Sequence, residues 1–146
     1  MSFENLFSNR ATAIKSSVIR EILKVTARPE VISFAGGLPS DMSFPVPQLQ
    51  AAFEKVLKDA PQAALQYSTT DGYAPLREWV AAEKSKNGAT ITPDQVIVVS
   101  GSQQALDLIG KVFMNEGDKV LVETPTYLGA LQAFDLCFPK FVSVAS

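Results

Sequence analysis

The stretch VIVVSGSQQALDLIGKV, residues 96–112, decides the fold. Its first four residues form a continuous β-branched run, which is typical of a strand covered on both faces. From residue 102 to 114 apolar residues recur at helical spacing, so a helix is predicted after the turn Ser100-Gly101-Ser102. The face of this helix that is expected to be buried carries Ala105, Leu108, Ile109, Val112 and Phe113.

The remainder of the C-terminal half continues this alternation. The turn NEGD, residues 115–118, leads into a second predicted strand at residues 120–122. A helical stretch at about residues 127–136 and a third strand at residues 141–145 follow. Strand–helix–strand–helix–strand predicts parallel crossovers and an α/β layered domain. Since three parallel strands leave faces and edges without cover, the architecture is expected to be incomplete.

The N-terminal half is predicted to be mostly helix and loop. Residues 1–30 are typical of an amphipathic arm, and residues 31–34 of a short strand. After a loop rich in glycine and proline, helices are predicted at residues 47–58 and 75–84, separated by a loop at residues 65–72. The apolar positions expected to be buried are Ile14, Val18, Ile19, Ile22, Leu23 and Val25 in the arm, Leu49, Phe53, Val56 and Leu57 in the first helix, and Leu76, Trp79 and Val80 in the second.

Composition excludes several classes of function. The chain has 146 residues, the size of one ordinary domain, and a net charge of −2, which gives no support for general binding to nucleic acid or an anionic membrane. Without histidine, the sequence excludes His-ligated zinc and Ser-His or Cys-His nucleophile pairs within this chain, and no metal site is expected. One cysteine, Cys137, allows no disulfide within the chain. With no membrane span and no signal peptide in its sequence, we expect a cytoplasmic protein.

The turn at residues 100–103 is the first candidate site. Helix N-termini at the carboxyl ends of strands present free N–H groups to anions. Gly101 lets the backbone approach a ligand, and Ser102 and Gln103 add side-chain donors suited to a phosphate monoester. The alternative, weighed equally, is that Ser102 only caps the helix and Gly101 only makes the turn. The pattern has no Walker lysine and no GxGxxG, which disfavours nucleotide binding.

Four other features are weaker candidates when taken singly. Tyr127 follows a predicted strand and offers a ring that could stack on a flat ligand, or it anchors its loop. Tyr67 offers a hydroxyl to a phosphate or anchors a loop. The pair Gly36-Gly37 allows close approach to a small molecule or makes a plain turn. Arg20 suits a carboxylate, although a single arginine on a helix is usually solvated.

Taken together, five segments resemble one family. These are IREILK (residues 19–24), FAGGLPS (34–40), LQYSTTDGYAPLR (65–77), VSGSQQALDL (99–108) and GDKVLVETPTYLGALQAF (117–134). In this order, they are similar to the fold-type I aminotransferases (class I/II) that use pyridoxal 5′-phosphate, and most similar to the 2-aminoadipate and kynurenine group. The resemblance runs from about residue 14 to the last residue.

The resemblance implies a fold and a domain division. The implied fold is the N-terminal part of the aspartate aminotransferase-like α/β fold, three α/β/α layers with a mainly parallel sheet, incomplete in this chain. Residues 1–45 would form the N-terminal arm and the start of the small domain. Residues 46–146 would form the first part of the large cofactor-binding domain. The strand at residues 96–99 would lie at one side of the sheet and the other two at the opposite side, with later strands between them.

The resemblance also implies roles for the candidate residues at the cofactor. Gly101, Ser102 and Gln103 match the turn that holds the cofactor phosphate. Tyr127 matches the aromatic residue that stacks on the pyridine ring. Tyr67 matches a tyrosine that reaches the phosphate of the neighbouring subunit in a homodimer, so the active site would be shared between subunits.

Two further matches concern the substrates, an amino acid and a 2-oxo acid. Gly37 matches a glycine whose backbone lines the substrate pocket. Arg20 matches a mobile arginine that meets an acidic substrate side chain in the aminoadipate branch. By the same resemblance, the Schiff-base lysine lies beyond residue 146, and Lys111 does not replace it because it would point away from the ligand end of its helix. We therefore expect no catalytic residue and no activity in this chain by itself.

Two other functions remain open at this point. One is the aminotransferase-like ligand-binding domain of a transcription regulator, although no basic helix-turn-helix precedes the arm. The other is an inert pseudo-enzyme fragment or a phosphate-binding module. The reading frame after residue 146 would separate these functions from an enzyme.

Overall fold

The computed structural model describes residues 3–13, 18–34 and 37–145. The chain divides into two compact units, one formed by Met1–Ile14 with Thr69–Ser146 and the other by Lys15–Ser68. Each unit is described by itself below. The predicted division after residue 45 follows the domains of a complete enzyme and stays a prediction.

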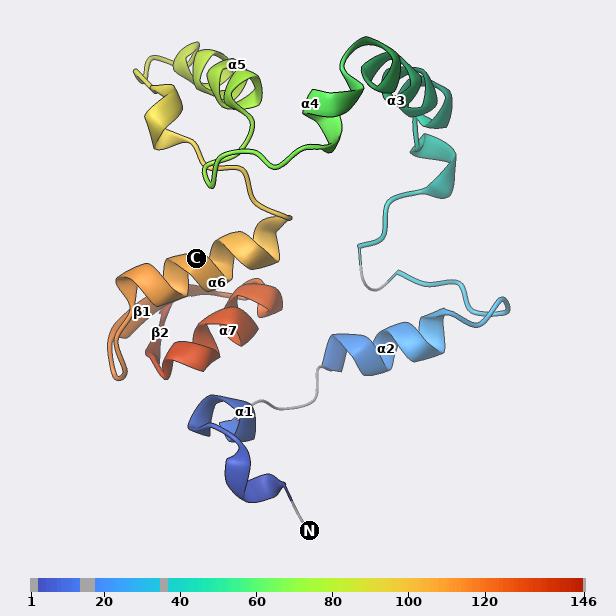
Figure 1. The fold of residues 1–146 in the computed structure, drawn as a ribbon. Helices are drawn as coiled ribbons and strands as arrows, with labels where there is room; N and C mark the ends of the chain where they lie inside the picture. The colour runs from blue at the N-terminus through green and yellow to red at the C-terminus, as the bar shows by residue number, and fades with distance from the viewer. Residues whose placement is uncertain (1–2, 14–17, 35–36, 146) are drawn as a thin grey trace. The chain divides into compact units, whose positions relative to one another are not determined.

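A parallel β-α-β crossover forms the C-terminal part of the first unit (Figure 1). Strand β1 (Lys119–Thr124) pairs in parallel with β2 (Lys140–Ala145), with Lys119 opposite Lys140. Helix α7 (Leu128–Phe134) and the 3-10 turn η4 (Asp135–Cys137) connect them. The predicted second and third strands and their parallel crossover are confirmed.

Helix α6 (Ser102–Phe113) packs against α7 in the same unit. The contact is close at Gly110, because a Cβ there would lie 3.1 Å from Cys137 Sγ and 3.5 Å from Phe134 Cδ1. On the face of α6 that was expected to be buried, Ala105 and Leu108 are half-buried. The rest of that face is exposed, namely Ile109, Val112 and Phe113.

The predicted strand at residues 96–99 is wrong as a strand, although the backbone there is extended, with φ −118° and ψ 127° at Val96. Its polar groups bond to a turn and a side chain instead of to a neighbouring strand. The Val98 N–H donates to the Asp71 carbonyl at 2.9 Å, and the Val96 carbonyl accepts from Arg77 Nε at 2.8 Å. A strand needs a partner, and within the described chain β1 and β2 pair only with each other.

Helix α5 (Ala74–Ser85), which fits the helix predicted at residues 75–84, precedes this extended segment and packs against the turn η3 (Pro93–Gln95). The N-terminal elements of the same unit are the turn η1 (Glu4–Leu6) and the short helix α1 (Asn9–Ala13), which lies against η4.

The second unit is helical and contains α2 (Val18–Thr26), the turn η2 (Asp41–Ser43), α3 (Val46–Asp59) and α4 (Pro61–Leu65). Helix α2 fits the predicted arm, whose positions 14–17 lie outside the described residues. Helix α3 fits the helix predicted at residues 47–58, and the short α4 was not predicted.

The strand predicted at residues 31–34 is wrong, because no strand is assigned there. Instead, the Val31 N–H donates to the Arg28 carbonyl at 3.0 Å, which forms a turn after the end of α2.

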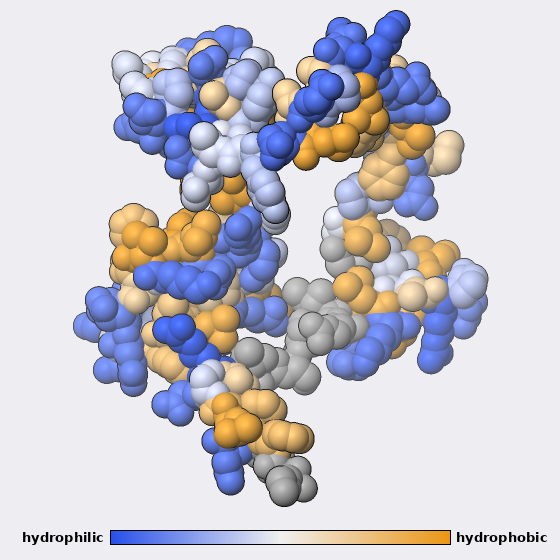
Figure 2. Space-filling model, viewed as in Figure 1, coloured by the Kyte–Doolittle hydropathy of each residue, from blue (hydrophilic) through white to orange (hydrophobic). Residues whose placement is uncertain are grey.

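Burial is sparse in both units. Among the described residues, Ala81 and Ala133 are the only buried apolar side chains. The buried face predicted for α3 is therefore wrong for this chain, since Phe53 is 69% exposed. The face predicted for α5 is confirmed only at the half-buried Val80, since Trp79 is 62% exposed. The helical spacing is correct, but the described residues of neither unit form a surface that covers these faces. Figure 2 shows apolar atoms on the visible surface around α3 and α6.

No helix in the described part of the chain combines the length and the apolar content that crossing a bilayer requires.

Candidate functional site

The N-terminus of α6 is a candidate anion site, because no side chain caps it. Gly101 occupies the cap position with φ 83°, a left-handed conformation that favours glycine, and no side chain caps the helix. Ser102 is the first helical residue and not the cap, so the capping alternative does not describe its position. Because the first N–H groups of a helix have no partner within it, those of residues 102–104 can bind an anion. Ser102 and Gln103 are exposed beside them.

Gln104, which the sequence analysis missed, braces this turn. Its Oε1 accepts a hydrogen bond from the backbone N–H of Ser100. A glutamine in the first turn of a helix that reaches back to a preceding N–H resembles half of a capping box, and that spacing is the signal that could have found it. The bond links the extended segment before the turn to the helix after it.

Tyr127 occupies the cap position of α7 and presents most of its side chain to solvent. Its backbone is extended, with φ −72° and ψ 112°, and the residue is 60% exposed. The interpretation of Tyr127 as a half-buried loop anchor is not what the structure shows. The exposed ring provides an aromatic surface on which a flat ligand could stack.

The anion site and this ring lie at the same end of the α6–α7 pair. Gly110, near the C-terminus of α6, approaches Phe134 at the C-terminus of α7, so the two helices run in the same direction (Figure 1). With a rise of 1.5 Å per residue, the helix starts lie roughly 12 Å and 9 Å back from this contact. Both also follow the carboxyl ends of extended segments, where ligands bind in α/β layers.

The three other predicted site residues belong to the second unit. Tyr67 is 99% exposed, and its backbone N–H donates to Gln66 Oε1 at 2.8 Å. Gly37 has φ 60° and open space where a side chain would be, while Gly36 lies outside the described residues. Arg20 belongs to α2, and its side chain lies outside the described part of the chain. The roles assigned to these residues stay predictions.

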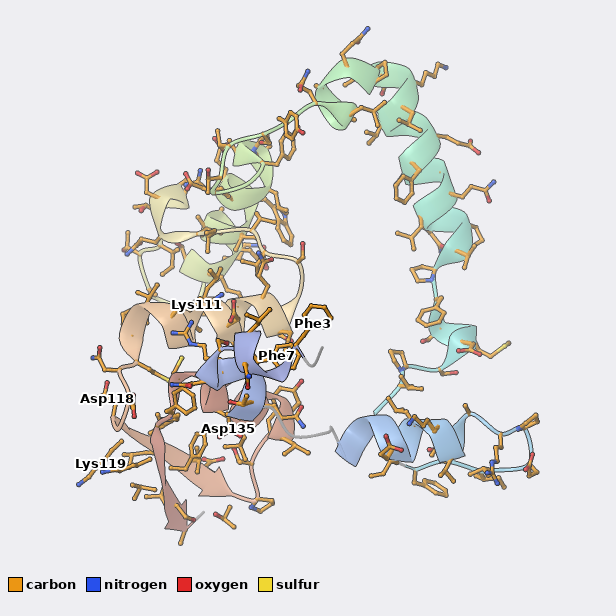
Figure 3. All side chains as sticks on the ribbon, turned by 60° about the horizontal axis from the view of Figure 1, so that its bottom comes forward. Phe3, Phe7, Lys111, Asp118, Lys119 and Asp135 are labelled. Carbon is orange, nitrogen blue, oxygen red and sulfur yellow. The ribbon has the colours of Figure 1, made fainter. Side chains whose placement is uncertain are left out.

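The donors at the α6 terminus fit the phosphate of pyridoxal 5′-phosphate, since free N–H groups stand beside a serine hydroxyl and a glutamine amide. The nearby lysines do not fit the role of its covalent partner. Lys111 Nζ pairs with Asp107 Oδ2 at 2.6 Å near the C-terminus of α6. Lys119 is the first residue of β1, so it lies at the end of the strand away from the candidate site. Figure 3 shows its side chain projecting outward.

A second concave region surrounds Arg77 and measures about 330 Å³. The Arg77 side chain is 11% exposed, and its guanidinium is held by ion pairs to Asp71 (3.4 Å) and Asp94 (3.6 Å), as well as by backbone carbonyls. Since its charge is already compensated, the cleft is part of the structural framework. The described residues contain no group of three or more side chains that could hold a metal ion.

The sequence profile of the family "Aminotransferase class I and II" matches residues 29–146. The chain belongs to the class I and II aminotransferases. It is 47% identical over 144 residues to the 2-aminoadipate transaminase of Thermus thermophilus, an alignment that covers 99% of this chain and 35% of the relative. This aminotransferase chain therefore spans about a third of the length of that relative.

Solved aminotransferases share the fold. The α-aminoadipate aminotransferase of Thermus thermophilus, solved with N-(5′-phosphopyridoxyl)-L-leucine, matches with a TM-score of 0.85 at 45% identity, over 99% of this chain and 35% of that one. The kynurenine aminotransferase of Pyrococcus horikoshii matches with a TM-score of 0.89 at 42% identity, over 99% and 36%. The fold is thus part of the aspartate aminotransferase-like α/β fold, incomplete in this chain, and the chain is of the 2-aminoadipate and kynurenine group.

Proposed function

We propose that this chain is the N-terminal portion of an aminotransferase that uses pyridoxal 5′-phosphate and moves an amino group from an amino acid to a 2-oxo acid. The observation that carries the proposal is the uncapped start of α6 at Gly101, at the same end of the helix pair as the exposed ring of Tyr127. An anion site and an aromatic surface are what a phosphorylated, flat cofactor requires. The phosphopyridoxyl compound bound to the Thermus thermophilus relative supports this choice.

In this proposal the residues of the first unit bind and orient the cofactor. The N–H groups of residues 102–104, together with the Ser102 hydroxyl and the Gln103 amide, bind the phosphate, and Gly101 allows the backbone to approach it. The ring of Tyr127 stacks on the pyridine ring and fixes its plane. When bound, the cofactor supplies the electron sink for the reaction. These residues would hold the cofactor by its phosphate and by one face of its ring.

The residues of the second unit provide the substrate side and the partner contact. The backbone at Gly37 lines the substrate pocket, and the planar guanidinium of Arg20 pairs with an acidic substrate side chain. Tyr67 donates its hydroxyl to the phosphate bound by the other subunit of a homodimer. Its nearly complete exposure is compatible with a partner outside its own unit. We place the enzyme in the cytoplasm, a compartment in which a single free thiol such as Cys137 persists.

The chain by itself is proposed to be inactive. Lys111 is ion-paired near the far end of α6, and we place the Schiff-base lysine after residue 146. The regulator alternative is not favoured, because the relatives that match over 99% of this chain at 47% and 45% identity are named as aminotransferases.

The test uses the full-length protein, by which we mean the whole polypeptide that contains this chain. Purified with pyridoxal 5′-phosphate, it should show the visible absorbance of the bound cofactor. It should also convert 2-oxoglutarate to glutamate in a coupled assay with 2-aminoadipate as the amino donor, while residues 1–146 alone stay at background. A full-length protein that neither binds the cofactor nor transfers an amino group from any amino acid would reject the proposal.

A further inference from the structure

Gly129 lies directly under the ring of Tyr127. It is the second residue of α7 and is buried. A Cβ at this position would lie 2.4 Å from Tyr127 Cζ, 2.5 Å from Oη and 2.8 Å from Cε1, closer than non-bonded atoms approach one another, so something would have to shift. The tyrosine ring therefore fills the space that any other residue at position 129 would need.

The backbone does not explain this glycine. Its φ lies outside the left-handed range, and a helical glycine is less favourable than alanine by about 1 kcal/mol. The clash of a Cβ is with the far end of one side chain, so α7 could accept alanine if the ring moved aside. Helix propensity favours alanine at this position, whereas the three atoms nearest to the missing Cβ all belong to the side chain of Tyr127.

Within the described part of the chain, no hydrogen bond holds the ring of Tyr127 in place. The phenol Oη makes no hydrogen bond to any residue that the structure describes, and Tyr127 does not cap α7 through its side chain. With 60% of the residue exposed, the ring contacts Gly129 and leaves much of its surface open. The van der Waals contact with Gly129 therefore contributes to the orientation of the ring.

We propose that Gly129 is a positioning residue for Tyr127, which holds the ring flat against the start of α7 so that its open face can stack on a planar ligand. The inference rests on the proposed function, in which that ligand is the pyridine ring of the cofactor. A methyl group at position 129 would displace the ring by about 1 Å, which is enough to spoil a stacked geometry. Gly129 acts through Tyr127 and touches neither cofactor nor substrate.

The test compares Gly129→Ala with the unmodified full-length protein through two measurements. The affinity for pyridoxal 5′-phosphate, from equilibrium dialysis, should fall about two- to tenfold, the range of one aromatic contact. The circular dichroism induced in the cofactor band should change, because it reports the orientation of the bound ring. The Tm of the apo-protein should stay equal or rise, because alanine favours the helix. A Tm below that of the unmodified protein would overturn the inference, since the glycine would then serve packing in general.

Two further variants separate this inference from the function on which it rests. In a Tyr127→Ala background, Gly129→Ala should have no further effect on affinity, and an undiminished effect there would overturn the inference. Gly110→Ala, a helical glycine that faces Cys137, is the matched control and should leave affinity unchanged. If Tyr127→Ala weakens binding and Gly129→Ala does not, the inference fails and the proposed function stands. If Tyr127→Ala itself leaves affinity unchanged, the stacking role fails and the inference fails with it.

Discussion

The Nε of Arg77 donates a hydrogen bond to the carbonyl of Val96 at 2.8 Å, and its Nη2 donates to the carbonyl of Pro93 at the same distance. The guanidinium is nearly buried and also pairs with Asp71, whose carbonyl accepts the N–H of Val98. One side chain of α5 thereby ties the turn at residues 69–72 to the extended segment that leads into the anion site.

Replacing this side chain should loosen that segment. In Arg77→Gln the carbonyls of residues 93 and 96 lose a charged donor, at roughly 1.5–3 kcal/mol for a hydrogen bond to a charged group. Hydrogen–deuterium exchange of the peptide that contains Val98 should speed up at least tenfold in the full-length protein. Lys111→Gln, which breaks only the exposed pair with Asp107, is the control and should leave that peptide unchanged. Equal protection in both variants would show that Arg77 does not hold the segment.

The close approach of α6 to α7 at Gly110 predicts the reactivity of the single thiol. In Gly110→Val the added carbons overpack against Cys137 Sγ and Phe134, at a cost of about 1–3 kcal/mol. The helices should separate and expose the half-buried thiol, so Cys137 should react several times faster with a disulfide reagent. Val112→Ala, on the exposed side of α6, should not change the rate. If the reaction rate of Cys137 is unchanged in Gly110→Val, the contact between α6 and α7 at Gly110 does not control access to the thiol.

The proposed phosphate site at the start of α6 predicts a specific loss of cofactor affinity when the Ser102 hydroxyl is removed. Ser102→Ala in the full-length protein should weaken cofactor affinity by about 1.5–3 kcal/mol, tenfold or more, because a hydrogen bond to a charged phosphate is lost. Ser8→Ala is the control, since Ser8 Oγ accepts the N–H of Ala11 and supports a helix start away from the site. If the cofactor affinity of Ser102→Ala equals that of the unmodified protein, the Ser102 hydroxyl does not bind the phosphate and this prediction is wrong.

The proposal that the active site is shared between subunits predicts complementation between two defective subunits. Tyr67→Phe removes the hydroxyl proposed to serve the neighbouring subunit, and a second variant lacks the cofactor lysine. In a mixed dimer, one site carries both defects and the other carries neither. Activity per mixed dimer, from an assay on purified heterodimers, should therefore approach half that of the unmodified protein. If Tyr67 serves its own subunit, the mixed dimer will show at most half the activity of Tyr67→Phe.

Local features were predictable from the sequence. The helix expected at residues 102–114 is α6, because a glycine turn and helical spacing are properties of consecutive residues. The parallel pairing of β1 with β2 followed from two apolar strands joined by one short helix. The candidate donors at the start of α6 were predictable for the same reason, since they are neighbours in the sequence, but the sequence did not decide whether Ser102 caps the helix.

Features that depend on distant partners were not predictable. The β-branched run at residues 96–99 indicated a buried strand, but pairing requires a neighbouring strand, and Arg77 and Asp71 bond to the segment instead. The helical spacing of apolar residues in α3 indicated an apolar face. Spacing within one helix does not show which other part of the protein covers that face. Gly129 offered one usable signal, an unfavourable glycine within a predicted helix, but the reason for it appears only when the ring of Tyr127 is placed.

The sparse burial in this chain matters during its synthesis. Apolar side chains such as Phe53 and Phe113 remain in contact with water after the helices have formed, and such surfaces attract chaperones, proteases and other unfinished chains. While these residues are newly made, secondary structure alone does not protect them. The yield of this polypeptide in a cell should then depend on the speed of translation and on chaperone supply, so slow expression at low temperature is the condition under which it should stay out of aggregates.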